Sequence, residues 1–210
     1  MADNYLENKF EQMRSGRKVV IRRNYPSLDT LLHRNRSIRR YSYGHIASRE
    51  ELEKIVEVNT LVASARNRQT LRFRLVTAEE AGKVVPLIHF GSDCPEETLP
   101  APGLEPQAFI VVCSTAEEDR YIDIDLGISL QSMGLKAAEM GLGNCIVCSF
   151  PADKLQETLN LEYKPLAVLC IGKAAESVFL RPVESGEPLK FYRKEGVRYV
   201  PKLKLKDILL

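Results

Sequence analysis

The pattern of hydrophobic and polar residues along this 210-residue chain changes repeatedly between helical and strand periodicity. Apolar residues recur at helical spacing in several segments, which predicts helices there. These segments are 4–13, 27–35, 48–62, one beginning at Thr77, 119–140 and 151–160. Residues 71–75 alternate apolar and polar side chains, as in a strand with one buried face. Continuous apolar runs predict buried strands at 108–113, 144–150 and 165–172.

Local signals mark the ends of several of these elements. Ser48 and Glu51 have the spacing of a capping box, which begins the helix at 48–62. Gly141 and Gly143 end the long helix, because glycine adopts the backbone conformations that terminate helices. We expect the inward face of that helix to carry apolar residues. They are Ile124, Ile128, Met133, Leu135 and Ala138.

The remaining segments lack regular periodicity. Residues 91–106 contain several prolines and are predicted to form a loop. The chain after residue 172 is polar and is expected to be extended as far as Asp207. Strands interleaved with unevenly spaced helices predict an α+β or mixed α/β sandwich. We expect one domain over 27–210, preceded by an N-terminal extension, 1–26, that packs on this domain or on a neighbour.

Composition narrows the function only slightly. Hydrophobic residues make up 44% and charged residues 28% of the chain, which is ordinary for a soluble domain. The net charge of +2 does not favour a general nucleic-acid or membrane-surface role. No apolar run reaches the roughly 18 residues of a membrane span, and the N-terminus is too polar for a signal peptide. We therefore expect a cytoplasmic protein with no membrane and no nucleic-acid partner.

Two basic clusters are candidate phosphate ligands. Arg36, Ser37 and Arg39 combine guanidinium groups with a hydroxyl, the donor set that holds a phosphate dianion. Lys202 and Lys204 place two ammonium groups on one face of an extended segment. Each cluster taken alone is more often a solvated surface than a binding site. Their joint occurrence favours a phosphorylated cofactor.

Other motifs have mainly structural interpretations. Cys145 and Cys148 form a Cys-x-x-Cys pair within a predicted strand, where the two side chains point to opposite faces. A zinc site would need two further ligands, and the histidines have no suitable spacing. The glycines at 141 and 143 follow a helix instead of opening one, which does not fit a dinucleotide-binding fingerprint. We therefore predict no metal ligands. We find no serine in a nucleophile elbow, so we also predict no side-chain nucleophile.

Four motifs, in order, resemble the nitroreductase family of FMN enzymes over about residues 30–210. The first is Arg36-Ser37-Ile38-Arg39, and the second is the stretch from Ser64 to Gln69 that enters a strand. The third is a long helix with Gln131 and paired alanines that ends in Gly-Leu-Gly. The fourth is the tail Val200-Pro201-Lys202-Leu203-Lys204. Their shared order is far more specific than any one motif.

The chain departs from the family pattern at four positions. Asn35 stands where the family has the first arginine of the basic pair, and Ala63 where a proline often precedes the serine. Thr70 and Leu71 replace a Pro-Trp pair. Loss of one charge-assisted hydrogen bond costs about 1.5–3 kcal/mol. FMN binding is therefore expected to be weaker by one or two orders of magnitude unless a neighbouring arginine substitutes.

The resemblance implies an α+β sandwich with a mixed, mainly antiparallel sheet flanked by helices, in an intertwined homodimer. It also implies a set of cofactor-binding residues. They are Arg36, Ser37, Arg39, Ala63, Ser64, Ala65, Asn67, Val147, Cys148, Ser149, Lys202 and Lys204. In the family, the first motif and the tail lysines hold the phosphate, and Arg39 would reach the ribityl chain and the N1–C2=O edge. The second-motif residues Ser64, Ala65 and Asn67 would come from the other subunit. The segment 147–149 would lie near flavin N5.

The activity implied by the resemblance is ping-pong reduction of nitroaromatic or quinone-like acceptors by NAD(P)H. The cofactor supplies the hard chemistry, so no side-chain acid or base is required, which agrees with the lack of a conventional catalytic group. Two alternatives stay open. One is a flavin-binding dimer with little reductase activity. The other is a different flavin reaction on the same fold, such as flavin breakdown or dehalogenation.

Overall fold

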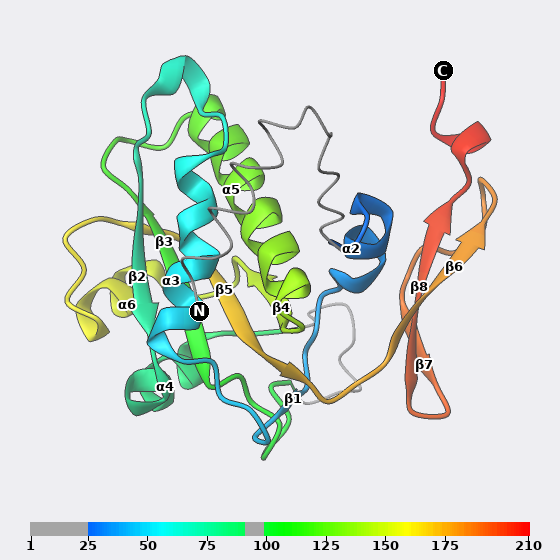
Figure 1. The fold of residues 1–210 in the computed structure, drawn as a ribbon, viewed down its shortest axis with the longest axis horizontal. Helices are drawn as coiled ribbons and strands as arrows, with labels where there is room; N and C mark the ends of the chain where they lie inside the picture. Colours follow the sequence, from blue (N-terminus) through cyan, green and yellow to red (C-terminus); the bar gives the residue numbers. More distant parts are fainter. Residues whose placement is uncertain (1–24, 91–98) are drawn as a thin grey trace, which may run out of the picture.

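The computed structural model describes residues 25–90 and 99–210 (Figure 1). The helix expected at 4–13, and most of the extension to which it was assigned, lie outside these residues. In the described part of the chain, the central sheet has five strands. They are β1 (Tyr41–Ser42), β2 (Leu71–Val76), β3 (Ala108–Ser114), β4 (Gly143–Val147) and β5 (Pro165–Ala174). Every pairing in this sheet is antiparallel, with β5 between β3 on one side and β4 and β1 on the other.

The central sheet separates two hydrophobic cores, because side chains along a buried strand alternate between its faces. On β3, Phe109 and Val111 belong to one core, whereas Ile110 and Val112 belong to the other. Helices α3 (Arg49–Val56) and α5 (Arg120–Glu139) cover the second core. Helices α4 (Ala78–Val84) and α6 (Ala152–Thr158) cover the first. A fully buried large apolar side chain contributes about 1.5–3 kcal/mol, so both cores stabilise the three-layer α+β sandwich.

The ends of the helices agree with the expected capping signals. The Ser48 hydroxyl accepts a hydrogen bond from the Glu51 N–H at 3.3 Å, and Glu51 accepts one from the Ser48 N–H at 2.9 Å. Short 3₁₀ turns follow α3 at Glu57–Thr60 and α4 at Val85–Leu87. Asp119 caps the N-terminus of α5, and its carboxylate accepts two backbone N–H groups at 2.8 Å. The helix ends at Glu139, and Gly141, with φ of +75°, follows its C-cap Met140.

The inward face of α5 differs from the sequence-based expectation. Ile122, Met133 and Ala137 are fully buried, whereas Ile124 is 48% exposed, so its expected inward position was wrong. The buried stripe also includes two polar residues, Asp125 and Ser129. A search for apolar periodicity passes over such positions, which shifts the predicted face around the helix axis.

One strand prediction also required correction. Strand β4 ends at Val147, so residues 148–150 are not part of it. The segment after β5, expected to be extended, contains three strands that the sequence did not predict: β6 (Val178–Val183), β7 (Tyr192–Lys194) and β8 (Val197–Leu203). These strands make a second sheet in the order β6-β8-β7, which we call the C-terminal sheet. It lies apart from the central sheet, with α2 (Leu28–Arg34) between the two in this view (Figure 1).

Candidate functional site

The loop after α2 carries the first basic cluster and is anchored to the edge of β4. The Ile38 N–H donates to the Asn144 carbonyl at 2.8 Å, and Ser37 pairs with Asn144 as an isolated bridge. The side-chain Nδ2 of Asn144 donates to Asn35 Oδ1 at 2.8 Å and to the Gly134 carbonyl at 3.3 Å. Asn35 Nδ2 donates to Gln131 Oε1 at 3.5 Å, so Asn35, which replaces an arginine of the family motif, ties this loop to β4 and α5.

A cavity of about 260 Å³ lies beside this loop. Its polar lining consists of cationic, amide and hydroxyl side chains from the loop, α5, β4 and β8. They are Asn35, Arg36, Ser37, Arg39, Gln131, Asn144 and Lys202. Within residues 25–90 and 99–210, no carboxylate lines this cavity. Three cations with neutral donors, unopposed by an acid, make a pocket suited to an anion.

Arg36 shows the clearest capacity for a further ligand. Its Nη2 donates to the Leu32 carbonyl at 2.5 Å. Its Nε is buried and has no hydrogen-bond partner among the described residues. Burial also lowers the pKa of this guanidinium from its ordinary value, because the charged form loses hydration. The cationic, hydroxyl and amide donors that line this pocket suit an anion, so the donor set fits the phosphate of FMN.

Lys204 does not share this pocket. Its ammonium group donates to Glu184 at 2.9 Å, and that hydrogen bond raises the pKa of the exposed lysine. The structure therefore brings Arg36, Ser37, Arg39 and Lys202 together and leaves Lys204 in an ion pair outside the pocket.

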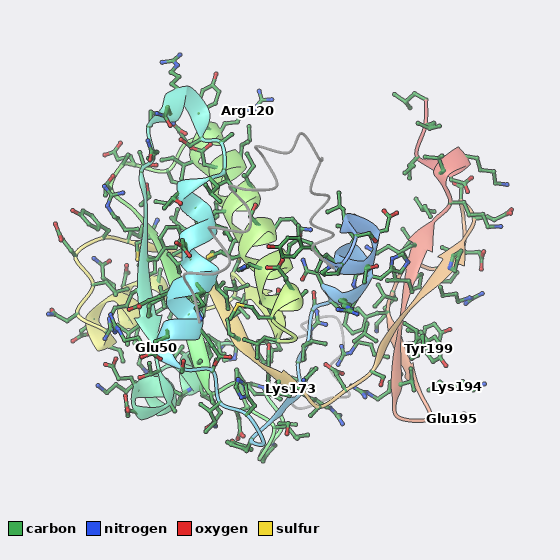
Figure 2. All side chains as sticks on the ribbon, viewed as in Figure 1. Glu50, Arg120, Lys173, Lys194, Glu195 and Tyr199 are labelled. Atoms are coloured by element: carbon green, nitrogen blue, oxygen red, sulfur yellow. The ribbon has the colours of Figure 1, made fainter. Side chains whose placement is uncertain are left out.

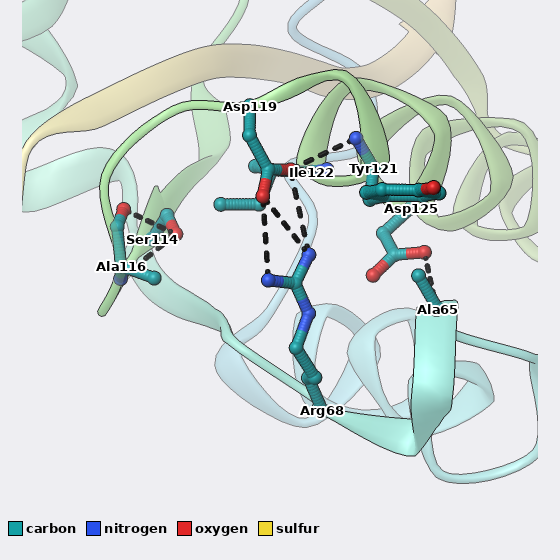
Figure 3. Close-up of polar contacts among 8 residues, drawn as sticks. All are labelled: Ala65, Arg68, Ser114, Ala116, Asp119, Tyr121, Ile122 and Asp125. Carbon is teal, nitrogen blue, oxygen red and sulfur yellow. Dashed lines mark hydrogen bonds and ion pairs between the residues drawn. The ribbon is translucent and has the colours of Figure 1, made fainter.

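The second motif lies elsewhere in the chain, against α5. Ala63 and Ser64 line a larger cavity of about 600 Å³, whereas Ala65 and Asn67 lie in a short 3₁₀ turn, Ala65–Asn67. The Asp125 carboxylate accepts the Ala65 N–H at 2.8 Å (Figure 3). Arg68 forms an ion pair with Asp119 at 3.3 Å in the same view. Asp119, which caps α5, and Asp125, within α5, thus hold this turn in place.

The backbone of this turn is strained. Arg66, Asn67 and Gln69 have φ values of 54°, 53° and 49°, in the left-handed region. Each such non-glycine residue costs about 1–3 kcal/mol, and the surrounding contacts must hold it. The contacts include the Gln69 N–H, which donates to the Ser64 hydroxyl at 3.3 Å. Strain of this kind concentrates at functional sites, which favours a binding role for the turn.

The third group of expected residues lies at the end of β4. Val147 is buried, whereas Cys148 and Ser149 are exposed. The Ser149 carbonyl accepts a hydrogen bond from the His89 N–H at 3.1 Å. None of the three residues lines either of the two cavities described above.

The Cys-x-x-Cys pair has the environment of structural cysteines. Burial raises the pKa of Cys145 to about 11, and partial desolvation raises the pKa of Cys148, although its side chain is exposed. Raised pKa values disfavour the thiolate, the form that attacks disulfides and binds metals. In the part of the chain that the structure describes, no three His, Cys, Asp or Glu side chains gather as metal ligands.

Several residues at these sites escaped the sequence analysis. Asn144 and Phe191 line the cationic pocket, and Asp125 lines the larger cavity. Asn144 carries no motif, and Phe191 lies in the segment interpreted as an extended tail. A signal was available for Asp125, because an acidic residue on the inward stripe of a long helix is unusual.

Together, these features define a three-layer α+β domain with a cationic pocket between its central and C-terminal sheets. A family model described as Nitroreductase family matches residues 32–173, and the chain belongs to that family. A search of curated protein sequences found no significant match. No helix in the described residues is long and apolar enough to cross a membrane.

Solved structures share the fold at low sequence identity. A nitroreductase family protein from Clostridium difficile 630 is 23% identical, with a TM-score of 0.57 over 72% of this chain and 86% of that one. One from Streptococcus pneumoniae TIGR4 is 15% identical, with a TM-score of 0.60 over 72% and 92%. A nitroreductase structure from Exiguobacterium sibiricum 255-15, named as a complex with FMN, is 22% identical, with a TM-score of 0.57 over 72% and 90%.

Proposed function

We propose that the protein is an FMN-dependent oxidoreductase that uses NAD(P)H to reduce nitroaromatic or quinone-like acceptors. The observation that carries this proposal is the pocket in which Arg36, Arg39 and Lys202 meet without an opposing carboxylate among the described residues. The chain belongs to the nitroreductase family, and one similar structure is named as an FMN complex. Another, from Sphigopyxis sp. strain HMH and 20% identical, is named as FMN- and NADPH-dependent.

The phosphate of FMN would be held by Arg36, Ser37 and Lys202, with Arg39 directed toward the ribityl chain. This assignment uses charge-assisted hydrogen bonds, which are about twice as strong as neutral ones. Lys204 would join them only if its ion pair with Glu184 opened. At about 260 Å³, the pocket is smaller than the roughly 300–1,000 Å³ of typical ligand sites. It would therefore hold the phosphate end, and the ring would extend onto a further surface.

The further surface would be provided by a second subunit, through Ala63, Ser64, Ala65 and Asn67. Within a single chain, Ala63 and Ser64 line the larger cavity of about 600 Å³ and not the cationic pocket. The same proposal places residues 147–149 beside the ring. Bound FMN would supply the redox chemistry, accepting hydride from NAD(P)H and passing electrons to an acceptor in a separate half-reaction. The chain would bind and orient it, with Arg39 as a fixed cation that favours the reduced form.

A homodimer is the expected form in solution. Large apolar side chains are exposed near the C-terminus, with Phe179 at 56%, Leu189 at 55% and Ile208 at 62%. Wrapping this region around a second copy would bury them. Analytical ultracentrifugation of flavin-loaded protein at micromolar concentration should give the mass of a dimer. A monomeric mass under these conditions would contradict both the dimer and the two-subunit cofactor site.

The cofactor and the reaction can be tested together. Heat release and chromatography should identify FMN, because the basic residues match one terminal phosphate and we find no adenine-binding fingerprint. Stopped-flow mixing with NADH and with NADPH should bleach the flavin absorbance, and turnover should follow with menadione or nitrofurazone. Release of FAD would contradict the cofactor assignment.

The same measurements separate the alternatives. Flavin-loaded protein that neither donor bleaches would favour a binding dimer without reductase activity. Bleaching without turnover on either acceptor would favour a different flavin reaction. Thr70 and Leu71, which replace the family's Pro-Trp pair, line the larger cavity and would affect which acceptors fit.

A further inference from the structure

Glu176 is a buried carboxylate in the segment that connects the central sheet to the C-terminal sheet. It lies between β5 and β6, and its side chain is 1% exposed. Its Oε1 accepts the Arg39 N–H at 2.6 Å. Its Oε2 accepts Arg193 Nη2 at 2.7 Å and Arg198 Nε at 3.2 Å. One side chain thus joins the loop of the first motif to β7 and β8.

The ring of Phe191 completes this cluster. The Arg39 guanidinium lies 4.9 Å from the ring centroid, and the Arg198 guanidinium lies 5.1 Å from it. Both distances are within the range of cation–π attraction. Arg198 is 1% exposed, and Phe191 lines the cationic pocket. The Arg39 side chain therefore packs against the Phe191 ring of this cluster.

The cationic pocket has two walls that come from different parts of the fold. Arg36 and Arg39 belong to the loop anchored on β4, whereas Lys202 belongs to β8. Glu176 contacts both walls but does not itself line the pocket. Its carboxylate forms ion pairs with Arg193 and Arg198, and no carboxylate lines the pocket itself within the described residues.

We propose that Glu176 is a positioning residue for the phosphate end of the cofactor. By joining Arg39 to β8, it sets how far the loop cations lie from Lys202. A carboxylate is required because three N–H donors converge on its two oxygens. A glutamine has one acceptor oxygen, and its amide nitrogen would face donors. This inference rests on the proposed FMN site.

The test compares FMN with riboflavin, which lacks the phosphate. Glu176→Gln should raise the dissociation constant for FMN about tenfold or more, the scale of one lost charge-assisted contact. Its dissociation constant for riboflavin should change less than about threefold, an expectation on the same free-energy scale. Glu195→Gln is the matched control, because Glu195 has the same charge and lies at the exposed turn between β7 and β8 (Figure 2). It should leave both constants unchanged. Equal losses for the two ligands in Glu176→Gln, or no loss, would overturn the proposal.

A second measurement does not depend on the cofactor. In flavin-free protein, Glu176→Gln should speed amide hydrogen exchange in residues 35–40 and 197–203, whereas Glu195→Gln should not. If the unaltered protein binds no FMN, the proposed function fails. If hydrogen exchange in both segments were also unchanged in Glu176→Gln, the proposed connection of Arg39 to β8 through Glu176 would be overturned as well.

Arg193→Gln serves if Glu176→Gln does not fold. It removes a guanidinium that donates to Glu176 and to the Gly196 carbonyl, from a side chain that is 20% exposed. It should weaken FMN binding in the same direction and spare riboflavin. Unchanged FMN binding in this variant would count against the proposal.

Discussion

Replacing Arg36 by alanine is expected to weaken FMN binding by one to two orders of magnitude. The guanidinium lines the pocket and has a buried Nε without a partner among the described residues. A charge-assisted hydrogen bond contributes about 1.5–3 kcal/mol, which corresponds to this range of affinity. Fluorescence titration of flavin-free protein with FMN measures the change directly.

Arg181→Ala is the matched control for this experiment. Arg181 lies on β6, is exposed, and pairs with Glu187 at 3.1 Å, away from the pocket. Its loss removes the same charge and should leave the dissociation constant within about twofold, since exposed ion pairs contribute about 1 kcal/mol or less. If the two variants weakened FMN binding equally, Arg36 would act only through overall charge. Arg36→Lys should recover part of the affinity, because lysine keeps the charge but loses the planar set of donors.

Gly143→Ala should both destabilise the protein and disturb the loop after α2. A Cβ atom at this position would lie 2.7 Å from Ile38 Cγ1 and 3.2 Å from Ile38 Cβ. Ile38 is buried and directly follows Ser37, so the loop would have to move away from β4. Overpacking of this kind costs about 1–3 kcal/mol. Urea unfolding should show a lower midpoint, and FMN titration a weaker affinity.

Gly82→Ala is the corresponding control. Gly82 lies within α4, and a Cβ atom there would meet no other atom within 4 Å. Alanine in a helix interior is favoured over glycine by about 0.5–1 kcal/mol, so this variant should be neutral or slightly more stable. A Gly143→Ala protein with unchanged stability and unchanged FMN affinity would show that the loop does not depend on its contact with β4.

Local sequence was sufficient for the centre of the fold. The apolar runs at 108–113 and 165–172 correspond to β3 and β5, which are buried on both faces and therefore need continuous apolar residues. The capping box at Ser48 and the glycine at 141 also depend only on neighbouring residues. The helix ends predicted from them were therefore confirmed. The C-terminal sheet was missed because its strands are partly exposed and carry polar and charged residues. Its parallel pairing of β6 with β8 joins segments that no local pattern connects.

The sequence by itself determined the chemistry of the first basic cluster and the family to which the chain belongs. Only the tertiary structure decided which distant cations join that cluster. Lys202 and Lys204 look equivalent in an extended segment, yet one lines the pocket and the other pairs with Glu184. Glu176 carries no motif, and its role depends on three donors brought together by β7, β8 and the loop after α2. Ion pairs and hydrogen bonds form between groups that lie close together in space. The order of residues along the chain does not reveal which groups those are.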